Sequence, residues 1–148
     1  MKHTVAAFLF INLMILGTNT ANAQCSGIVK QGIKKVAPFA YNNQVNNAKI
    51  QAGKTATFHL SFFRGVSYKL NICSDESVGK LSYRILDENG AEVYNSAKDN
   101  NADIYSFYSN SSQELVVEIK ALDQTKSGCV AVVTGMQVPG TANPGRDL

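Results

Sequence analysis

His59 is the side chain best suited to transfer a proton near neutral pH, and most forms of nucleophilic catalysis need such a group. The only other histidine, His3, lies in a segment that we expect to be removed. His59 stands in the alternating run Thr55–Phe63, on the polar side that also carries Thr57 and Ser61. No G-x-S-x-G motif occurs in the sequence. We therefore predict no catalytic residues and interpret His59 as an exposed strand residue.

Acidic turns are the places where this sequence could bind a metal. The run Asp87–Gly90 begins like a calcium loop, but Lys98 occupies the twelfth position, where such a loop needs a bidentate glutamate. A hairpin turn explains this run better. Weak calcium binding by Asp75-Glu76 or by Asp99–Asp103 stays open, and the cysteines lack the paired spacing of a zinc site. We expect no metal and no cofactor.

Three cysteines allow one disulfide and leave one thiol over. Cys73 ends the predicted strand Val66–Ile72, and Cys129 begins the last predicted strand. Antiparallel pairing of these strands would set the end of one beside the start of the other, within disulfide reach. We therefore predict a Cys73–Cys129 disulfide, with Cys25 free or paired between chains. Cys25 could still pair with Cys73 or Cys129 if the N-terminal segment that carries it is flexible.

The first 23 residues have the pattern of a secretory signal peptide. Lys2 precedes the apolar run Val5–Leu16, and the segment ends in the small-x-small sequence Ala21–Ala23. The apolar run is too short to span a bilayer comfortably, and Gln24 is not the small residue that precedes a lipid-modified cysteine. We expect cleavage before Gln24, export to the periplasm or beyond, and no stable membrane insertion after cleavage.

The charge of the chain argues against two classes of partner. The formal net charge is +3 and falls to +2 without Lys2, and Lys34-Lys35 is the only adjacent basic pair. So weak and scattered a positive charge excludes a nucleic acid or an anionic membrane as the expected partner.

Short alternating segments dominate the rest of the chain and indicate strands. They are a first strand around Ile50, then Thr55–Phe63, Val66–Ile72, Leu81–Ile85 with its return strand near Val93, Ile104–Ser109 and Glu114–Ala121. Cys129–Met136 is apolar throughout, which is typical of a strand buried on both sides. Ser26–Val36 has near-helical spacing, and Pro38 ends it.

These segments predict an all-β fold, an antiparallel β-sandwich or jelly roll of seven to eight strands with one short N-terminal helix. A closed barrel is the structural alternative. The expected organisation is a signal peptide (1–23), a helix and loop packed on the domain (24–47), the β-sandwich (48–138) and a flexible tail (139–148). Phe39–Asn47 is interpreted as a loop and Leu81–Asn95 as a hairpin. In Ile104–Ser109 the inward side chains are either Tyr105 and Phe107 or Ile104 and Tyr108.

Four stretches within Thr55–Met136 resemble a known class of secreted module. They read FFRGVSYKLNICSD, KLSYRILDENGAEVYNSA, LVVEIKA and GCVAVVTG. Their turns and core positions are similar to those of pre-peptidase C-terminal (PPC-like) β-sandwich domains, and to small exported proteins of Bacteroidetes. The resemblance implies an accessory, non-catalytic module, and it transfers no catalytic residue to this chain. No catalytic domain accompanies the module in this sequence, which favours a free-standing binding or structural role.

Three functions are compatible with these observations. The first is an exported, non-catalytic binding module of the cell envelope, whose partner is an envelope protein or a glycan. The second is a small secreted hydrolase that uses paired carboxylates, which would require two acids on one concave face. The third is a subunit that adds a strand to a partner in a surface assembly, which would require an uncovered edge strand. We favour the first.

Overall fold

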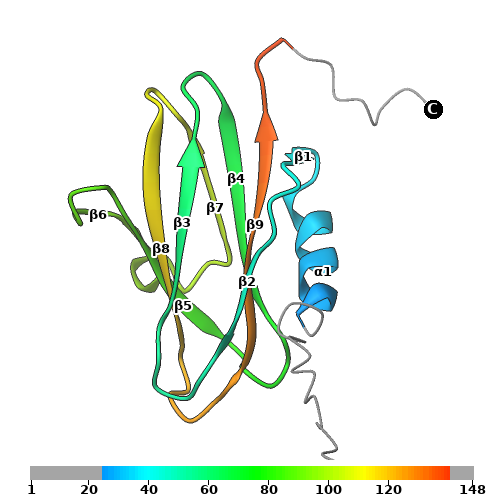
Figure 1. Ribbon diagram of the computed structural model, residues 1–148, viewed down its shortest axis with the longest axis vertical. Helices are drawn as coiled ribbons and strands as arrows, with labels where there is room; N and C mark the ends of the chain where they lie inside the picture. The colour runs from blue at the N-terminus through cyan, green and yellow to red at the C-terminus, as the bar shows by residue number, and fades with distance from the viewer. Residues whose placement is uncertain (1–24, 141–148) are drawn as a thin grey trace, which may run out of the picture.

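Two antiparallel sheets pack face to face, and one helix covers the outer side of the larger sheet (Figure 1). The computed structural model describes residues 25–140, so the predicted signal peptide and most of the predicted tail lie outside the described residues. The elements are α1 (Ser26–Val36), β1 (Ala40–Tyr41), β2 (Asn46–Ile50), β3 (Ala56–Phe62), β4 (Ser67–Ser74), β5 (Leu81–Leu86), β6 (Glu92–Asn95), the 3-10 turn η1 (Ser96–Lys98), β7 (Ile104–Tyr108), β8 (Gln113–Ala121) and β9 (Gly128–Gln137). The predicted β-sandwich with one N-terminal helix is confirmed. Between residues 25 and 140, no helix is long and apolar enough to cross a membrane.

Strand β9 lies in the middle of the larger sheet. Its antiparallel neighbours are β4 on one side and β1 and β2 on the other, and β7 follows β4 at the edge. The first eight residues of β9 are buried. Val130 and Val132 face the interior of the sandwich, whereas Ala131 and Val133 face α1. The prediction that this strand is buried on both sides is confirmed, and α1 is the element that covers its second face.

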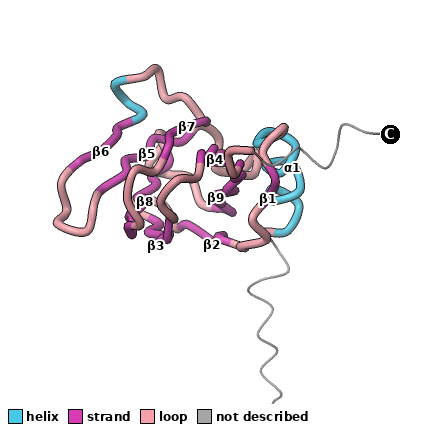
Figure 2. Tube along the Cα trace, turned by 90° about the horizontal axis from the view of Figure 1, so that it is seen from above, coloured by secondary structure: helices cyan, strands magenta, loops and turns pink. Residues whose placement is uncertain are grey.

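The smaller sheet has the order β3-β8-β5-β6. Strands β5 and β6 form the predicted hairpin, and Oδ1 of Asp87 accepts hydrogen bonds from the backbone N–H groups of Asn89 (2.9 Å) and Ala91 (2.8 Å). Gly90 has a φ of 80°, a conformation that favours glycine. Figure 2 shows that the chain after β6 passes through η1 and a loop to β7, and so connects the two sheets along one side.

A row of six aromatic rings runs through the interior and links the two sheets. Neighbouring ring centroids lie 4.3–5.6 Å apart along the order Phe62, Tyr68, Phe107, Tyr105, Tyr94, Tyr83. Contacts of this kind add about 0.5–1.5 kcal/mol each beyond the burial of apolar area. They also decide the orientation of β7, because Tyr105 and Phe107 face inward while Tyr108 is exposed.

The predicted disulfide is wrong. Cys25 is bonded to Cys129, with a Cα–Cα distance of 5.5 Å, and Cys73 carries a free thiol. Strand β4 pairs with β9 in the predicted antiparallel sense, but the register sets Cys73 opposite Ala131 and not opposite Cys129. The start of α1 instead brings Cys25 against β9, so the disulfide fastens the helix to the sheet.

The predicted loop Phe39–Asn47 contains β1 and the first residues of β2. Both strands pair with β9 on the side away from β4, where its backbone supplies hydrogen-bonding groups regardless of the side chains opposite. Asparagine is depleted in strands, so local propensity gave no sign of this pairing. The two-residue β1 also explains why the structure has nine strands within residues 25–140 and not seven to eight.

Candidate functional site

His59 lies where the sequence analysis placed it, on the exposed face of β3. Its side chain is 63% exposed, and its Nδ1 atom is 3.0 Å from Oε1 of Glu114 on the neighbouring strand β8. Among the hydrogen bonds within residues 25–140, none joins the His59 ring to a cysteine thiol or a serine hydroxyl. The geometry is that of an exposed cross-strand pair, whose contribution to stability is small.

We predict that the His59→Ala substitution changes stability little. Because the pair with Glu114 is exposed, its loss should cost less than about 1 kcal/mol. Leu115→Ala, in the core beside Glu114, is the matched control and should cost about 2–5 kcal/mol. Urea denaturation measures both. A loss at His59 as large as that at Leu115 would show that the histidine has a structural partner besides Glu114.

Four carboxylates each contact a separate basic side chain, and no two of these four share a partner. The contacts are Asp103 with Lys35 (2.6 Å), Glu118 with Arg84 (2.6 Å), Glu92 with Lys98 (2.8 Å) and Glu114 with His59 (3.0 Å). In residues 25–140, no group of three or more His, Cys, Asp or Glu side chains is placed to hold a metal ion.

Asp75, one of the residues considered for a weak calcium loop, is engaged by the protein itself. Its Oδ2 accepts a hydrogen bond from the N–H of Cys129 (2.8 Å), and its Oδ1 accepts from the hydroxyl of Ser77 (2.6 Å) and the N–H of Val78 (3.2 Å). Partial burial raises the pKa of Asp75, but these hydrogen bonds outweigh burial, so its pKa is lower than usual. Asp75 therefore fastens the β4–β5 loop to the start of β9.

A cavity of about 490 Å³ lies between α1, the end of β4, the start of β5 and the loop before β7. We call it the α1 pocket. Its lining residues are Gln31, Gly32, Lys35, Asn71, Ile72, Cys73, Ser74, Gly79, Lys80, Leu81, Tyr83, Asn100, Asn101, Ala102, Asp103 and Leu122. This volume is within the usual range for small-molecule sites.

The pocket exists because two edge strands stop short. Strand β7 pairs with β4 only as far as Asn71, and β6 pairs with β5 only from Arg84 onward. The last residues of β4 and the first residues of β5 therefore have no strand on that side within the described chain. The loop that closes the gap contains Asn100 and Asn101, both with positive φ (48° and 55°), a conformation that asparagine tolerates better than most residues.

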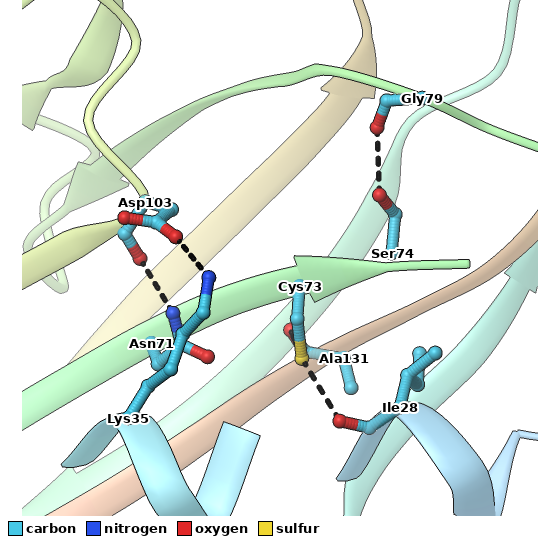
Figure 3. A network of polar contacts seen from close by, with 8 residues as sticks. All are labelled: Ile28, Lys35, Asn71, Cys73, Ser74, Gly79, Asp103 and Ala131. Atoms are coloured by element: carbon cyan, nitrogen blue, oxygen red, sulfur yellow. Dashed lines mark hydrogen bonds and ion pairs between the residues drawn. The ribbon is translucent and has the colours of Figure 1, made fainter. Parts of the chain in front are cut away.

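Polar contacts of Asp103 hold this loop against α1 and β4 (Figure 3). Its carboxylate accepts from Lys35 Nζ at 2.6 Å, and its backbone oxygen accepts from Asn71 Nδ2 at 3.2 Å and from the N–H of Ile72 at 2.8 Å. The helix can approach this closely because residue 32 is glycine. A Cβ atom there would lie 2.5 Å from Val133 Cγ2 and 3.2 Å from Asn71 Oδ1.

Within residues 25–140, five buried side-chain polar atoms have no hydrogen-bond partner, and three of them lie around the α1 pocket: Asn71 Oδ1, Tyr83 Oη and Asn101 Oδ1. Asn71 is fully buried and Tyr83 is 3% exposed. The hydroxyl of the neighbouring Tyr94 donates to Asp99 (2.8 Å), and burial, together with Tyr94, raises the pKa of Tyr83 far above its usual range. Leaving such groups without a partner costs about 1–3 kcal/mol each, so their presence around one cavity calls for a ligand or ordered water.

The free thiol of Cys73 also lines the pocket. Its Sγ atom lies 3.6 Å from the carbonyl oxygen of Ile28 and 3.7 Å from that of Ala131 (Figure 3 draws the contact with Ile28). Burial raises the pKa of Cys73 to about 11; nearby Lys35 lowers it, and Asp103 raises it further. The thiol is therefore protonated at neutral pH, which makes it a poor nucleophile.

We predict that alkylation of Cys73 by iodoacetamide keeps accelerating up to about pH 11, whereas an ordinary thiol levels off near pH 9. Between these values the unfolded thiol loses its proton and the folded thiol keeps it, so the free energy of unfolding should fall as the pH rises. Mass spectrometry of the folded protein measures the rate, with Cys73→Ser as the blank. A rate that levels off near pH 9 would mean that the thiol is solvated.

The sequence analysis missed most of this site. It considered Cys73 only for a disulfide, and Asn71 only as one residue of the predicted strand Val66–Ile72. Tyr83 lies in the predicted strand Leu81–Ile85, and in the structure it belongs to the buried core. Asp103 was considered only for calcium, and in the structure it pairs with Lys35.

Comparisons with known proteins show similarity to solved structures alone. No family model matches the sequence, and no curated protein matches it. Among solved structures, the crystal structure of Aeromonas hydrophila PliG, a periplasmic lysozyme inhibitor of g-type lysozyme, is similar with a TM-score of 0.49 and 6% identity, over 68% of this chain and 89% of that chain. A similarity of this degree carries no argument about function. The resemblance to PPC-like domains stays a prediction.

Proposed function

We propose that the protein is an exported, non-catalytic binding module and that the α1 pocket holds its ligand. The observation that carries the proposal is the gathering of Asn71, Tyr83 and Asn101, each with a buried polar atom that lacks a partner, around one cavity. Ligand sites combine a cavity with a few convergent polar groups, and this cavity has both.

Export is supported by two independent features. The predicted signal peptide ends before Gln24, and the adjacent Cys25 is bonded to Cys129. Disulfides persist in oxidising compartments such as the periplasm and the extracellular space, and are rare in reducing ones. An envelope protein or a glycan is therefore the class of partner that the module would meet.

Addition of a strand to a partner is the second candidate, because β3 and β7 are edge strands. In residues 25–140, β3 pairs only with β8, and β7 pairs only with β4. An uncovered edge can accept an extended segment of another protein. The pocket is the stronger candidate because free edges are common to open sandwiches, whereas a cluster of unpartnered buried polar atoms is rare.

Native mass spectrometry can test the pocket because it detects any bound molecule by its mass. The mature protein is incubated with a protein-free, low-molecular-weight extract of its own cell envelope. Ala102→Trp fills the pocket, and Thr57→Trp, on the exposed outer face of β3, is the matched control. We expect an added mass on the wild type and on Thr57→Trp, and none on Ala102→Trp. No added mass, or one that survives Ala102→Trp, would contradict the proposal.

A further inference from the structure

The unpartnered atoms of the α1 pocket define what a ligand must offer. Asn71 Nδ2 donates to the backbone oxygen of Asp103, so the amide of Asn71 is oriented and its free atom is the oxygen, an acceptor. Asn101 Oδ1 is a second acceptor, and the hydroxyl of Tyr83 can donate or accept. A matching ligand therefore has to bring hydrogen-bond donors.

Two of the protein's own donors near these atoms are already in use. Lys35 Nζ is bonded to Asp103 at 2.6 Å, and the Ser74 hydroxyl donates to the backbone oxygen of Gly79 at 2.7 Å. A peptide would bring one carbonyl acceptor for each N–H donor and would need an equal number of donors from the protein. Hydroxyl groups avoid this difficulty, because each can donate to an amide oxygen and accept from another group.

The charges around the pocket favour a neutral ligand. Lys35 and Asp103 compensate each other, and Lys80 adds one cation to the lining. An ammonium ligand would be repelled by the two lysines, and an anionic ligand would meet the amide oxygens of Asn71 and Asn101. The lining also includes the apolar side chains of Ile72, Leu81 and Leu122, which suit the C–H groups of a ring.

We infer that the α1 pocket binds a neutral, hydroxyl-rich ligand of the size of one or two sugar units, held through Asn71, Tyr83 and Asn101. This inference rests on the proposed function and specifies its ligand. All three polar atoms are buried in the structure, so side chains around the pocket have to rotate before a ligand can reach them. Asn101 is the side chain best placed to turn, because it is only partly buried and lies in the loop before β7.

Two variants remove single polar groups without disturbing the backbone. Tyr83→Phe deletes only the buried hydroxyl beside Tyr94, so affinity should fall while stability changes little. Tyr68→Phe is its matched control, because the Tyr68 hydroxyl accepts the N–H of Phe63 (2.9 Å) outside the pocket. Asn101→Gly removes the amide at a positive φ, and Asn43→Gly makes the same change at a similar φ (59°) in a loop outside the pocket.

Calorimetric titration of the mature protein tests the inference, with a panel of neutral mono- and disaccharides as probes. A capped neutral tripeptide and inorganic phosphate represent the other ligand classes. We expect at least one saccharide to bind with a Kd on the order of 1 mM or tighter, and Tyr83→Phe and Asn101→Gly each to weaken it about tenfold. The Tyr68→Phe and Asn43→Gly controls should bind as the wild type does.

Several results would overturn the inference. They are an absence of saccharide binding, binding of the peptide or phosphate alone, binding that is unaffected by both pocket variants, or a crystal structure in which ordered water alone satisfies the three atoms. If no saccharide binds while the envelope extract still adds a mass that Ala102→Trp abolishes, the ligand class is wrong and the proposed function stands. If the extract adds no mass either, both fail.

Discussion

A variant without the Cys25–Cys129 disulfide, Cys25→Ala/Cys129→Ala, is expected to lose about 4 kcal/mol of stability. The bridge joins residues 104 apart, and in the chain-entropy model a closed loop of that length restricts the unfolded chain strongly. The loss should be concentrated in α1, because the helix buries only a narrow apolar face against β9 and short helices are marginal without tertiary packing.

Urea denaturation measures the total loss, and amide hydrogen exchange measures its distribution. Exchange in Ser26–Val36 should accelerate more than exchange in β9. Cys73→Ser is the control, and it should cost far less because Cys73 closes no loop. A variant as stable as the wild type would contradict the described arrangement of the helix. So would peptide mapping of the wild-type protein that finds Cys73 bonded to Cys129.

Asp75→Ala is expected to cost about 2–3 kcal/mol. The change leaves the N–H group of Cys129 without its acceptor at the point where the β4–β5 loop meets β9, and it removes one of the two acceptors of the Val78 N–H. Gly128 shows how tightly this point is packed, since a Cβ atom there would lie 2.5 Å from Asp75 Oδ1. Asp123→Ala is the matched control, because Asp123 is exposed and, among the described residues, its carboxylate accepts hydrogen bonds only from Thr125 within its own turn.

The pH dependence gives the Asp75 prediction a second measurement. Because the pKa of Asp75 is lower in the folded protein than in the unfolded chain, its stabilising effect is present above the unfolded pKa near 4. The effect should be lost as the pH falls through the lower folded value. Denaturation midpoints between pH 2 and 6 should therefore vary less for Asp75→Ala than for the wild type. An unchanged pH profile together with unchanged stability would show that the loop does not need this anchor.

Side-chain periodicity predicted which residues face which side, but it could not determine strand register. The apolar run of β9 and the helical spacing of Ser26–Val36 both gave correct elements. The prediction of a Cys73–Cys129 disulfide was wrong because Cys129 and Ala131 lie two residues apart on the same face of β9. A register shift of two residues leaves every side chain on its face, so the hydrophobic pattern cannot distinguish the two partners of Cys73.

The α1 pocket could not be predicted from the sequence because it depends on where strands end. Five segments of the chain contribute to it, and the cavity opens because β6 and β7 stop short of their neighbours. Tyr83 illustrates the difficulty. Its place on the apolar side of β5 followed from alternation, but the lack of a partner for its hydroxyl depends on Tyr94 and Asp99, which lie beyond the hairpin turn.

The position of ligand-induced changes in a ¹⁵N NMR spectrum tests most directly whether the α1 pocket is the binding site. The labelled mature protein is compared with and without the protein-free envelope extract. We expect the shifted amide signals to be those of β4 near Asn71, the start of β5 and the loop around Asn101, and we expect Ala102→Trp to abolish the shifts. Shifts confined to the edges of β3 or β7, or no shifts at all, would contradict the assignment of binding to this pocket.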